Sequence, residues 1–344
     1  MALPPILTGL RLPVIAAPLF IISVPRLVIA QCKTGIVGSM PALNARPASL
    51  LDEWLAEITE ALAAHDRAHP EAPAAPFAIN QIVHKSNDRL DHDLAMCEKY
   101  KVPLVITSLG ARPEVNQAVH AWGGLVLHDV INNTFAHKAV DKGADGLVAV
   151  AAGAGGHAGT KNPLALIQEI RAWFDGPLAL SGAIATGNAI LAAQAMGADL
   201  AYIGSAFIAT EEARADEAYK RMIVEGNSDD IVYSNLFTGV HGNYLKPSIR
   251  AAGLDPDALP SSNPDAMNFG STRKPWKDIW GCGQGIGAVR KVESVAARVE
   301  ALETEYRGAQ RRLLASTGER SISGISKAAE HAIPWPSSPA VSRS

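Results

Sequence analysis

The sequence has little of what disulfide-bonded, metal-binding or nucleic-acid-binding proteins need. Its three cysteines, Cys32, Cys97 and Cys282, are odd in number, far apart and form no CxxC pair. This spacing suggests neither a disulfide framework nor a zinc site, and it fits a reducing compartment. Lysine and arginine form no run, and the formal net charge is −3. A basic field that would attract nucleic acid or an anionic membrane is therefore missing, which favours small-molecule chemistry.

The chain also lacks a long uninterrupted hydrophobic run. Its apolar start, residues 1–30, is broken by Arg11, Arg26 and several prolines, and no charged segment precedes a cleavage-like site. We therefore expect a folded N-terminus and a cytoplasmic protein, without a signal peptide or a transmembrane helix. Because 48% of the 344 residues are hydrophobic, the chain can bury a sizeable core.

Short apolar runs alternate with amphipathic segments through the first two hundred residues, which is typical of βα units around a parallel sheet. The eight runs are residues 12–18, 35–40, 77–83, 103–110, 123–130, 146–153, 177–184 and 200–207. Eight repeats close most naturally into a (β/α)8 barrel, since an open doubly wound sheet usually stops at five or six strands. We therefore predict an α/β fold with a TIM barrel over residues 1–207.

The alternation stops after the eighth run. Residues 208–315 carry helical segments and a loop-rich stretch at 252–276, which predict a helical cap. Residues 316–344 have little apolar periodicity and are expected to form a C-terminal tail. An apolar cap and a long tail are compatible with a homodimer.

Two small-residue loops follow the seventh and eighth runs, where TIM barrels tend to bind phosphate groups. The first loop contains Ser181 and Gly182, and the second contains Ser205. Glycine lets backbone N–H groups approach an anion, the serine hydroxyls can donate hydrogen bonds, and the helices that follow favour negative charge at their N-termini. Either loop alone would be read as a tight turn, but the two together predict a phosphorylated ligand.

The stretch AAGAGGHAG, residues 151–159, places a single histidine among glycine and alanine. His157 is the only side chain there that can move a proton near neutral pH. It follows the sixth run, at the end of the barrel where catalytic residues lie, so it is the candidate catalytic residue. The alternative is that His157 caps the helix that follows and takes no part in chemistry.

Taken together, these motifs resemble the nitronate monooxygenase family, FMN-dependent enzymes formerly called 2-nitropropane dioxygenases. The resemblance rests on AGGHAG (154–159), the segment 180–210, the first apolar unit (12–40), PFAIN (76–80) and IWGCGQGIGAV (279–289). Flavin enoyl-ACP reductases and NADH:quinone reductases are relatives of that family. The resemblance implies a TIM barrel that binds FMN, with residues 279–289 returning toward the flavin.

Carried over to this sequence, the resemblance implies a set of cofactor contacts. It makes Ala17 and Pro18 backbone neighbours of the flavin ring and Asn80 a polar contact to the ring region. Gly155 and Gly156 become close backbone neighbours of FMN. The phosphate site consists of Gly182, Ala183, Gly204 and Ser205, and His128 could reach the same ligand. For Asn80 the alternative is a strand-end cap, and for His128 it is a structural histidine.

The resemblance also implies the reaction. FMN would oxidise an alkyl nitronate or nitroalkane, and O2 would then give a carbonyl compound and nitrite. His157 would take the α-proton as a base or, if protonated, attract the nitronate anion. Two alternatives stay open: an NADH-dependent FMN reductase that acts on a quinone or an enoyl thioester, and a non-catalytic flavin-binding barrel.

Some positions depart from the family pattern. Milder departures are Leu19, Ala183 and Ser205, where many relatives carry Met, Gly and Thr. Val150 and Gly153 stand where relatives often carry polar residues, which predicts a less polar pocket and bulkier or more apolar substrates. In the predicted cap, the candidates for the pocket wall or for packing are His241, Tyr244, Lys246, Trp276 and Trp280.

Overall fold

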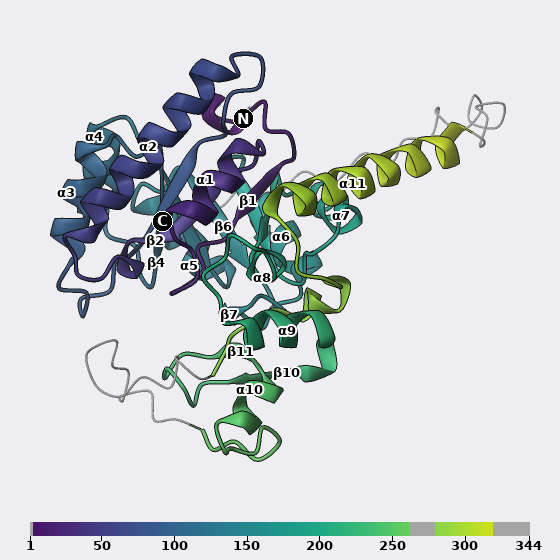
Figure 1. Cartoon of the computed structure of the whole chain (residues 1–344). Coiled ribbons are helices and arrows are strands. Elements are labelled where there is room, and N and C mark those ends of the chain that lie inside the picture. Colours follow the sequence, from purple (N-terminus) through teal and green to yellow (C-terminus); the bar gives the residue numbers. More distant parts are fainter. Residues whose placement is uncertain (1–2, 262–278, 319–344) are drawn as a thin grey trace, which may run out of the picture.

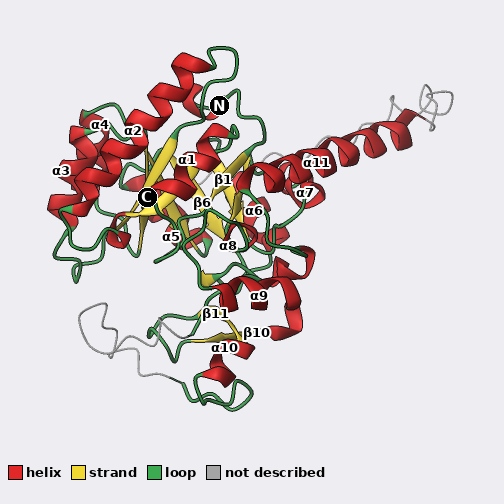
Figure 2. Cartoon of the chain, in the orientation of Figure 1, coloured by secondary structure: helices red, strands yellow, loops and turns green. Residues whose placement is uncertain are grey.

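The computed structural model describes residues 3–261 and 279–318 (Figure 1). Its centre is a group of eight parallel strands with helices around it (Figure 2). The strands are β1 (Val14–Ala16), β2 (Gly38–Pro41), β3 (Phe77–Ile82), β4 (Leu104–Ser108), β5 (Leu125–Val130), β6 (Gly146–Val150), β8 (Leu178–Ser181) and β9 (Leu200–Ile203). Each strand overlaps one of the eight apolar runs, so the predicted barrel is confirmed.

The strands close into a ring. Their order is β1-β9-β8-β6-β5-β4-β3-β2, and the two ends of this series meet beside Val37. There the Ala16 N–H donates to the Val37 carbonyl at 2.8 Å, and the Val37 N–H donates to the Val14 carbonyl at 3.1 Å. This closure excludes the open doubly wound sheet.

Helices connect the strands and cover the barrel. They are α1 (Pro25–Lys33), α2 (Leu50–Ala68), α3 (Leu90–Lys99), α4 (Pro113–Ala121), α5 (Asn133–Asp141), α6 (Pro163–Arg171), α7 (Gly187–Ala195) and the short α8 (Ser205–Ile208). Asn132, Asn162 and Thr186 start α5, α6 and α7, because each side chain accepts a hydrogen bond from a backbone N–H of the first turn.

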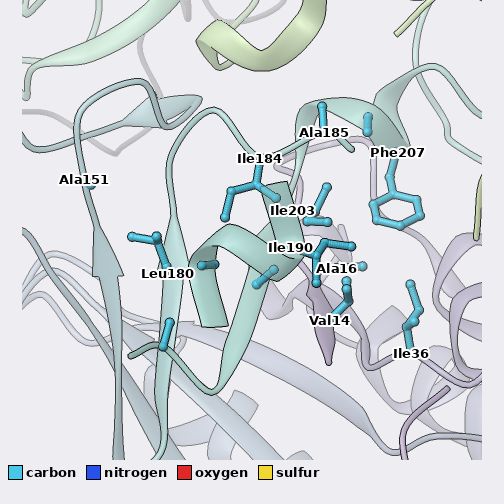
Figure 3. Packing of buried hydrophobic residues seen from close by; sticks show 14 of the residues in the cluster. Val14, Ala16, Ile36, Ala151, Leu180, Ile184, Ala185, Ile190, Ile203 and Phe207 are labelled. Carbon is cyan, nitrogen blue, oxygen red and sulfur yellow. The ribbon is translucent and has the colours of Figure 1, made fainter. Parts of the chain in front are cut away.

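Alternate strand residues serve two cores. Val14 and Ala16 belong to the cluster between strands and helices, whereas Ile15 belongs to a separate buried cluster built from the other faces of the strands. In the cluster between strands and helices, Ile203 of β9 lies close to Ile190 of α7 (Figure 3). The barrel is therefore packed on both sides of its wall, which fixes the strand ends that carry the site.

The region after β9 contains a small sheet as well as helices. The helices described here are α9 (Glu217–Glu225), α10 (Lys246–Ala251) and α11 (Val295–Gly318). The 3-10 helices within residues 3–261 and 279–318 are Pro5–Leu7, Ala42–Asn44, Ser228–Asp230 and Gln284–Ala288. β10 (Ile231–Ser234) and β11 (Gly242–Leu245) pair antiparallel, and β11 also pairs with β7 (Gly156–His157). The sequence predicted helices here but not this sheet, which lies below the barrel in Figure 1.

No described helix is both long enough and apolar enough to cross a membrane. All three cysteines are buried and carry free thiols. Within residues 3–261 and 279–318, no three His, Cys, Asp or Glu side chains gather where they could hold a metal ion.

Candidate active site

A cavity of about 820 Å³ opens at the carboxyl ends of the strands. This volume lies in the range of small-molecule and cofactor sites. The structure brings all twelve predicted site residues to its wall: Ala17, Pro18, Asn80, His128, Gly155, Gly156, His157, Ser181, Gly182, Ala183, Gly204 and Ser205. Residues from six strand ends thus meet around one space, as the barrel topology requires.

The loops after β8 and β9 form one end of the cavity. Gly182 has a φ of 144°, which side-chain-bearing residues rarely adopt. The Ser205 hydroxyl oxygen accepts a hydrogen bond from the Gly283 N–H at 2.8 Å, so its proton can be donated to a ligand. The Ala183 N–H is already used within the protein, because it donates to the Gly153 carbonyl at 3.2 Å.

Two glycines before His157 are explained by two different steric features. A Cβ on Gly155 would lie 2.7 Å from the backbone nitrogen of Gly283, so this glycine lets the segment from Ile279 to Gly285 pack against the loop. Gly156 has a φ of 64° and open space where a Cβ would stand. Part of the glycine run therefore accommodates the returning chain, and part of it faces the cavity.

His157 lies on β7, and its ring reaches across to the loop before β11. Its Nε2 is 3.1 Å from the Thr238 hydroxyl oxygen. The Thr238 hydroxyl also lies 2.8 Å from the Val240 carbonyl oxygen, to which it can donate. Burial lowers the pKa of His157 to about 4. The imidazole is therefore neutral near pH 7.

His128 and Asn80 are buried polar residues of the strand ends. His128 Nδ1 is 2.6 Å from the Thr107 hydroxyl, and burial lowers the pKa of His128 to about 4. Asn80 donates through Nδ2 to the Ile106 carbonyl at 3.0 Å and to the Ser108 hydroxyl at 2.8 Å. Both side chains thus have structural partners, and Asn80 has its Oδ1 to offer to a ligand.

Sequence reasoning missed a polar cluster beside these residues. Ser108, Asp129 and Tyr202 also line the cavity, and the Ser108 hydroxyl donates to Asp129 Oδ2 at 2.5 Å. Burial raises the pKa of Asp129 to about 6, although the hydrogen bond from Ser108 opposes the rise. A sequence signal was available, because all three are polar residues at or near the ends of predicted strands.

Cations gather at the mouth of the cavity. Arg46, Lys138 and Lys142 line it, and none of them forms an ion pair with a carboxylate among the residues that the structure describes. Arg46 lies over the Phe20 ring at 5.2 Å, and Lys138 lies over the Phe135 ring at 5.7 Å. The mouth therefore combines positive charge with aromatic surface.

The predicted cap residues divide into two groups. Tyr244 and Trp280 line the cavity, and Trp280 also stacks on Tyr219 at 4.7 Å. His241 is exposed and stacks on Tyr233, and Lys246 pairs with Asp257 at 3.2 Å, so both lie outside the cavity wall. Trp276 lies outside the described residues. Val150 and Gly153 do line the cavity, as their places in the sequence predict.

Comparison with known proteins identifies the family. A family model described as nitronate monooxygenase matches residues 6–250. A nitronate monooxygenase from Paraburkholderia phytofirmans is 28% identical over 313 residues, which cover 77% of this chain and 82% of that protein.

Two solved structures share the fold. Nitroalkane oxidase from Streptomyces ansochromogenes has a TM-score of 0.74 and 24% identity, covering 88% of this chain and 97% of that one. FabK from Thermotoga maritima has a TM-score of 0.71 and 21% identity, covering 90% of this chain and 97% of that one. The family model spans more than half of the sequence and the cavity carries the family motifs. The chain therefore belongs to the nitronate monooxygenase family of flavin-dependent oxidoreductases.

Proposed function

We propose that the protein binds FMN and oxidises alkyl nitronates or nitroalkanes with O2, giving a carbonyl compound and nitrite. The observation that carries this proposal is His157, a half-buried imidazole that is neutral near pH 7 and lies on the wall of the cavity. A neutral imidazole can accept the acidic α-proton of a nitroalkane, which a protonated one cannot.

The residues of the cavity fit an anionic, phosphorylated cofactor. Gly182, Gly204, Ser181 and Ser205 would hold the phosphate through backbone N–H groups and hydroxyls. Asp129 is the only carboxylic acid among the described lining residues, so little negative charge opposes the phosphate. When bound, FMN supplies the oxidation of the substrate, and the protein positions the substrate and takes up its α-proton.

His157 would act through the unprotonated nitrogen of its neutral imidazole. Its Nε2 lies 3.1 Å from the Thr238 hydroxyl oxygen, which also lies 2.8 Å from the Val240 carbonyl oxygen. Thr238 is therefore a positioning residue, which holds the imidazole by a hydrogen bond. Val150 and Ile131 add apolar wall nearby, and such a wall favours substrates with an alkyl chain.

A second candidate function is favoured by the cationic mouth. An NADH-dependent FMN reductase acting on an enoyl thioester would receive a substrate whose phosphorylated carrier is anionic. Arg46, Lys138 and Lys142 suit such a carrier, and the pKa of Arg46 is lowered by burial and by the neighbouring charges of Arg89 and Arg214. An anion would relieve this repulsion between guanidinium groups.

Stopped-flow absorbance of the purified yellow protein tests both candidates. The protein is mixed without O2 with ethyl nitronate and, separately, with NADH. Bleaching of the flavin by the nitronate, with none by NADH, supports the monooxygenase. Rapid bleaching by NADH would overturn it in favour of the reductase. A flavin-loaded protein that neither donor bleaches would point to a non-catalytic flavin-binding barrel.

A further inference from the structure

Three neighbouring strands end in a connected row of polar side chains. Asn80 of β3 donates through Nδ2 to the hydroxyl of Ser108 on β4, at 2.8 Å. Ser108 in turn donates to Oδ2 of Asp129 on β5, at 2.5 Å. All three side chains line the cavity, and the row ends on the carboxyl group.

The carboxyl group at the end of the row is only half satisfied. Oδ2 of Asp129 accepts from Ser108, whereas Oδ1 is inaccessible to solvent and has no hydrogen-bond partner within the described part of the chain. A buried carboxylate oxygen without a donor is costly, and a proton on the group lowers that cost. This environment agrees with the pKa of about 6 to which burial raises Asp129.

No cation compensates the charge of Asp129. Among the described residues no arginine, lysine or histidine lies within ion-pair distance of it. The other titratable and charged groups among the described lining residues are His84, His128, His157, Arg46, Lys138, Lys142, Tyr202, Tyr219 and Tyr244. Of these, Tyr202 responds to the charge of Asp129, because burial and, to a smaller extent, that charge raise the pKa of Tyr202 well above its usual value.

We infer that Asp129 takes up one proton from solvent when the flavin in this cavity is reduced. Ser108 and Asn80 are the residues that position its carboxyl group. The inference rests on the flavin site of the proposed function. Reduction adds negative charge to a cavity that already holds this carboxylate, and two like charges at low dielectric repel. The proton bonds to an oxygen of Asp129. The carboxyl group itself is not reduced, because the electrons pass from the reductant to the flavin.

The test is a redox titration of the flavin-loaded protein with dithionite at a series of pH values. In the wild type, the midpoint potential should fall as the pH rises, and from about pH 6 upward the slope should become steeper. The additional slope should correspond to one further proton taken up per flavin reduced. Asp129→Asn should lack this steeper range, because the amide cannot take up the proton. Ser108→Ala removes a hydrogen bond that lowers the pKa of Asp129, so the range should begin at higher pH. His69→Gln is the control, because His69 is exposed and lies outside the cavity wall, and it should keep the wild-type profile.

An unchanged steep range in Asp129→Asn would overturn the inference. If that variant does not fold, redox-difference infrared spectra of wild-type protein with 13C-labelled aspartate decide. A protonated-carboxyl band that forms on reduction at pH 7 supports the inference, and its absence overturns it. The two proposals fail separately. Protein that shows the steep range but leaves nitronates unoxidised contradicts only the proposed function, whereas turnover of nitronates without the steep range contradicts only the role of Asp129.

Discussion

At the scale of the residue, burial decides which form of histidine faces the cavity. His157 and His128 come from different strands, yet burial lowers the pKa of each to about 4. Both are therefore neutral across the physiological range. Of the two uses of His157 that the sequence left open, a neutral base fits this environment better than a protonated anchor for the nitronate.

The first prediction concerns His157→Asn. We expect this variant to retain FMN and to lose about 10²–10⁴-fold in kcat/KM for neutral nitroethane, the usual contribution of a positioned base. Turnover of preformed ethyl nitronate should fall far less, because that substrate has already lost its α-proton. Steady-state oxygen consumption with both substrates measures the difference.

Thr238→Val is the matched variant for this prediction. It removes the hydroxyl that contacts His157 Nε2 but leaves the imidazole in place. We expect a smaller loss with nitroethane and little change with the nitronate. Equal losses on the two substrates in His157→Asn would assign His157 to anion binding. An unchanged kcat/KM with nitroethane would show that His157 is not the base.

The second prediction concerns the stability that the protein loses in acid because of His128. Its pKa is about 4 in the folded protein and about 6.5 when unfolded, so only the unfolded chain gains this proton as the pH falls between those values. The free energy of unfolding should therefore drop by about 3 kcal/mol from this residue between pH 6.5 and 4, with no contribution to the slope above pH 7. Urea unfolding at a series of pH values measures it.

His128→Gln should flatten this part of the stability profile. His69→Gln is the control, since the His69 side chain is 54% exposed, and it should leave the profile as in the wild type. If His128→Gln retains the full acid drop, other groups must cause it.

At the scale of the element, the strands were predictable because their residues alone decide them. A parallel strand buried on both faces reads as a short apolar run, and all eight runs became strands of the barrel. The small sheet was not predictable in the same way. β7 has two residues, Gly156 and His157, and its partner Gly242 lies far along the chain. Glycine has low strand propensity, and such distant pairing leaves no local pattern.

The same limit applies within the site. The glycine and serine loops after β8 and β9 are local motifs, so the sequence could indicate them. The row from Asn80 through Ser108 to Asp129 links three strands whose residues are more than twenty positions apart. Only the register of the parallel barrel brings these side chains together.

The third prediction concerns the contact between α7 and α11. A Cβ on Gly187, the first residue of α7, would lie 2.2 Å from both the Leu302 carbonyl oxygen and the Tyr306 nitrogen. Gly187→Ala should therefore force the two helices apart and lower the free energy of unfolding by about 1–3 kcal/mol. Thermal or urea unfolding monitored by circular dichroism gives the change.

Gly308→Ala on the facing helix is the control. Its Cβ would meet no atom closer than 3.5 Å, and alanine is the better helix former by about 1 kcal/mol. That variant should be as stable as the wild type or more so. A Gly187→Ala protein of wild-type stability would mean that α11 does not pack on α7 in solution as the structure has it.

At the scale of the whole molecule, charge is distributed unevenly. The chain carries a net charge of −3, yet the mouth of the cavity presents Arg46, Lys138 and Lys142. A positive mouth on an acidic protein concentrates anions where they can enter, and salt weakens the effect. An alkyl nitronate and a phosphorylated thioester carrier are both anions, so this field would serve either candidate reaction.

The last prediction follows from this field. For an anionic nitronate, kcat/KM should fall by roughly three- to tenfold when ionic strength rises from low to several tenths molar. The double variant Lys138→Gln/Lys142→Gln should have a lower kcat/KM at low salt and a weaker salt dependence, because two of the three cations are gone. Lys33→Gln removes one lysine at the end of α1, outside the cavity wall, and should behave as the wild type. Neutral nitroethane should show no such salt dependence in any variant. A nitronate kcat/KM that is equally salt-dependent with and without Lys138 and Lys142 would place the steering charge elsewhere on the molecule.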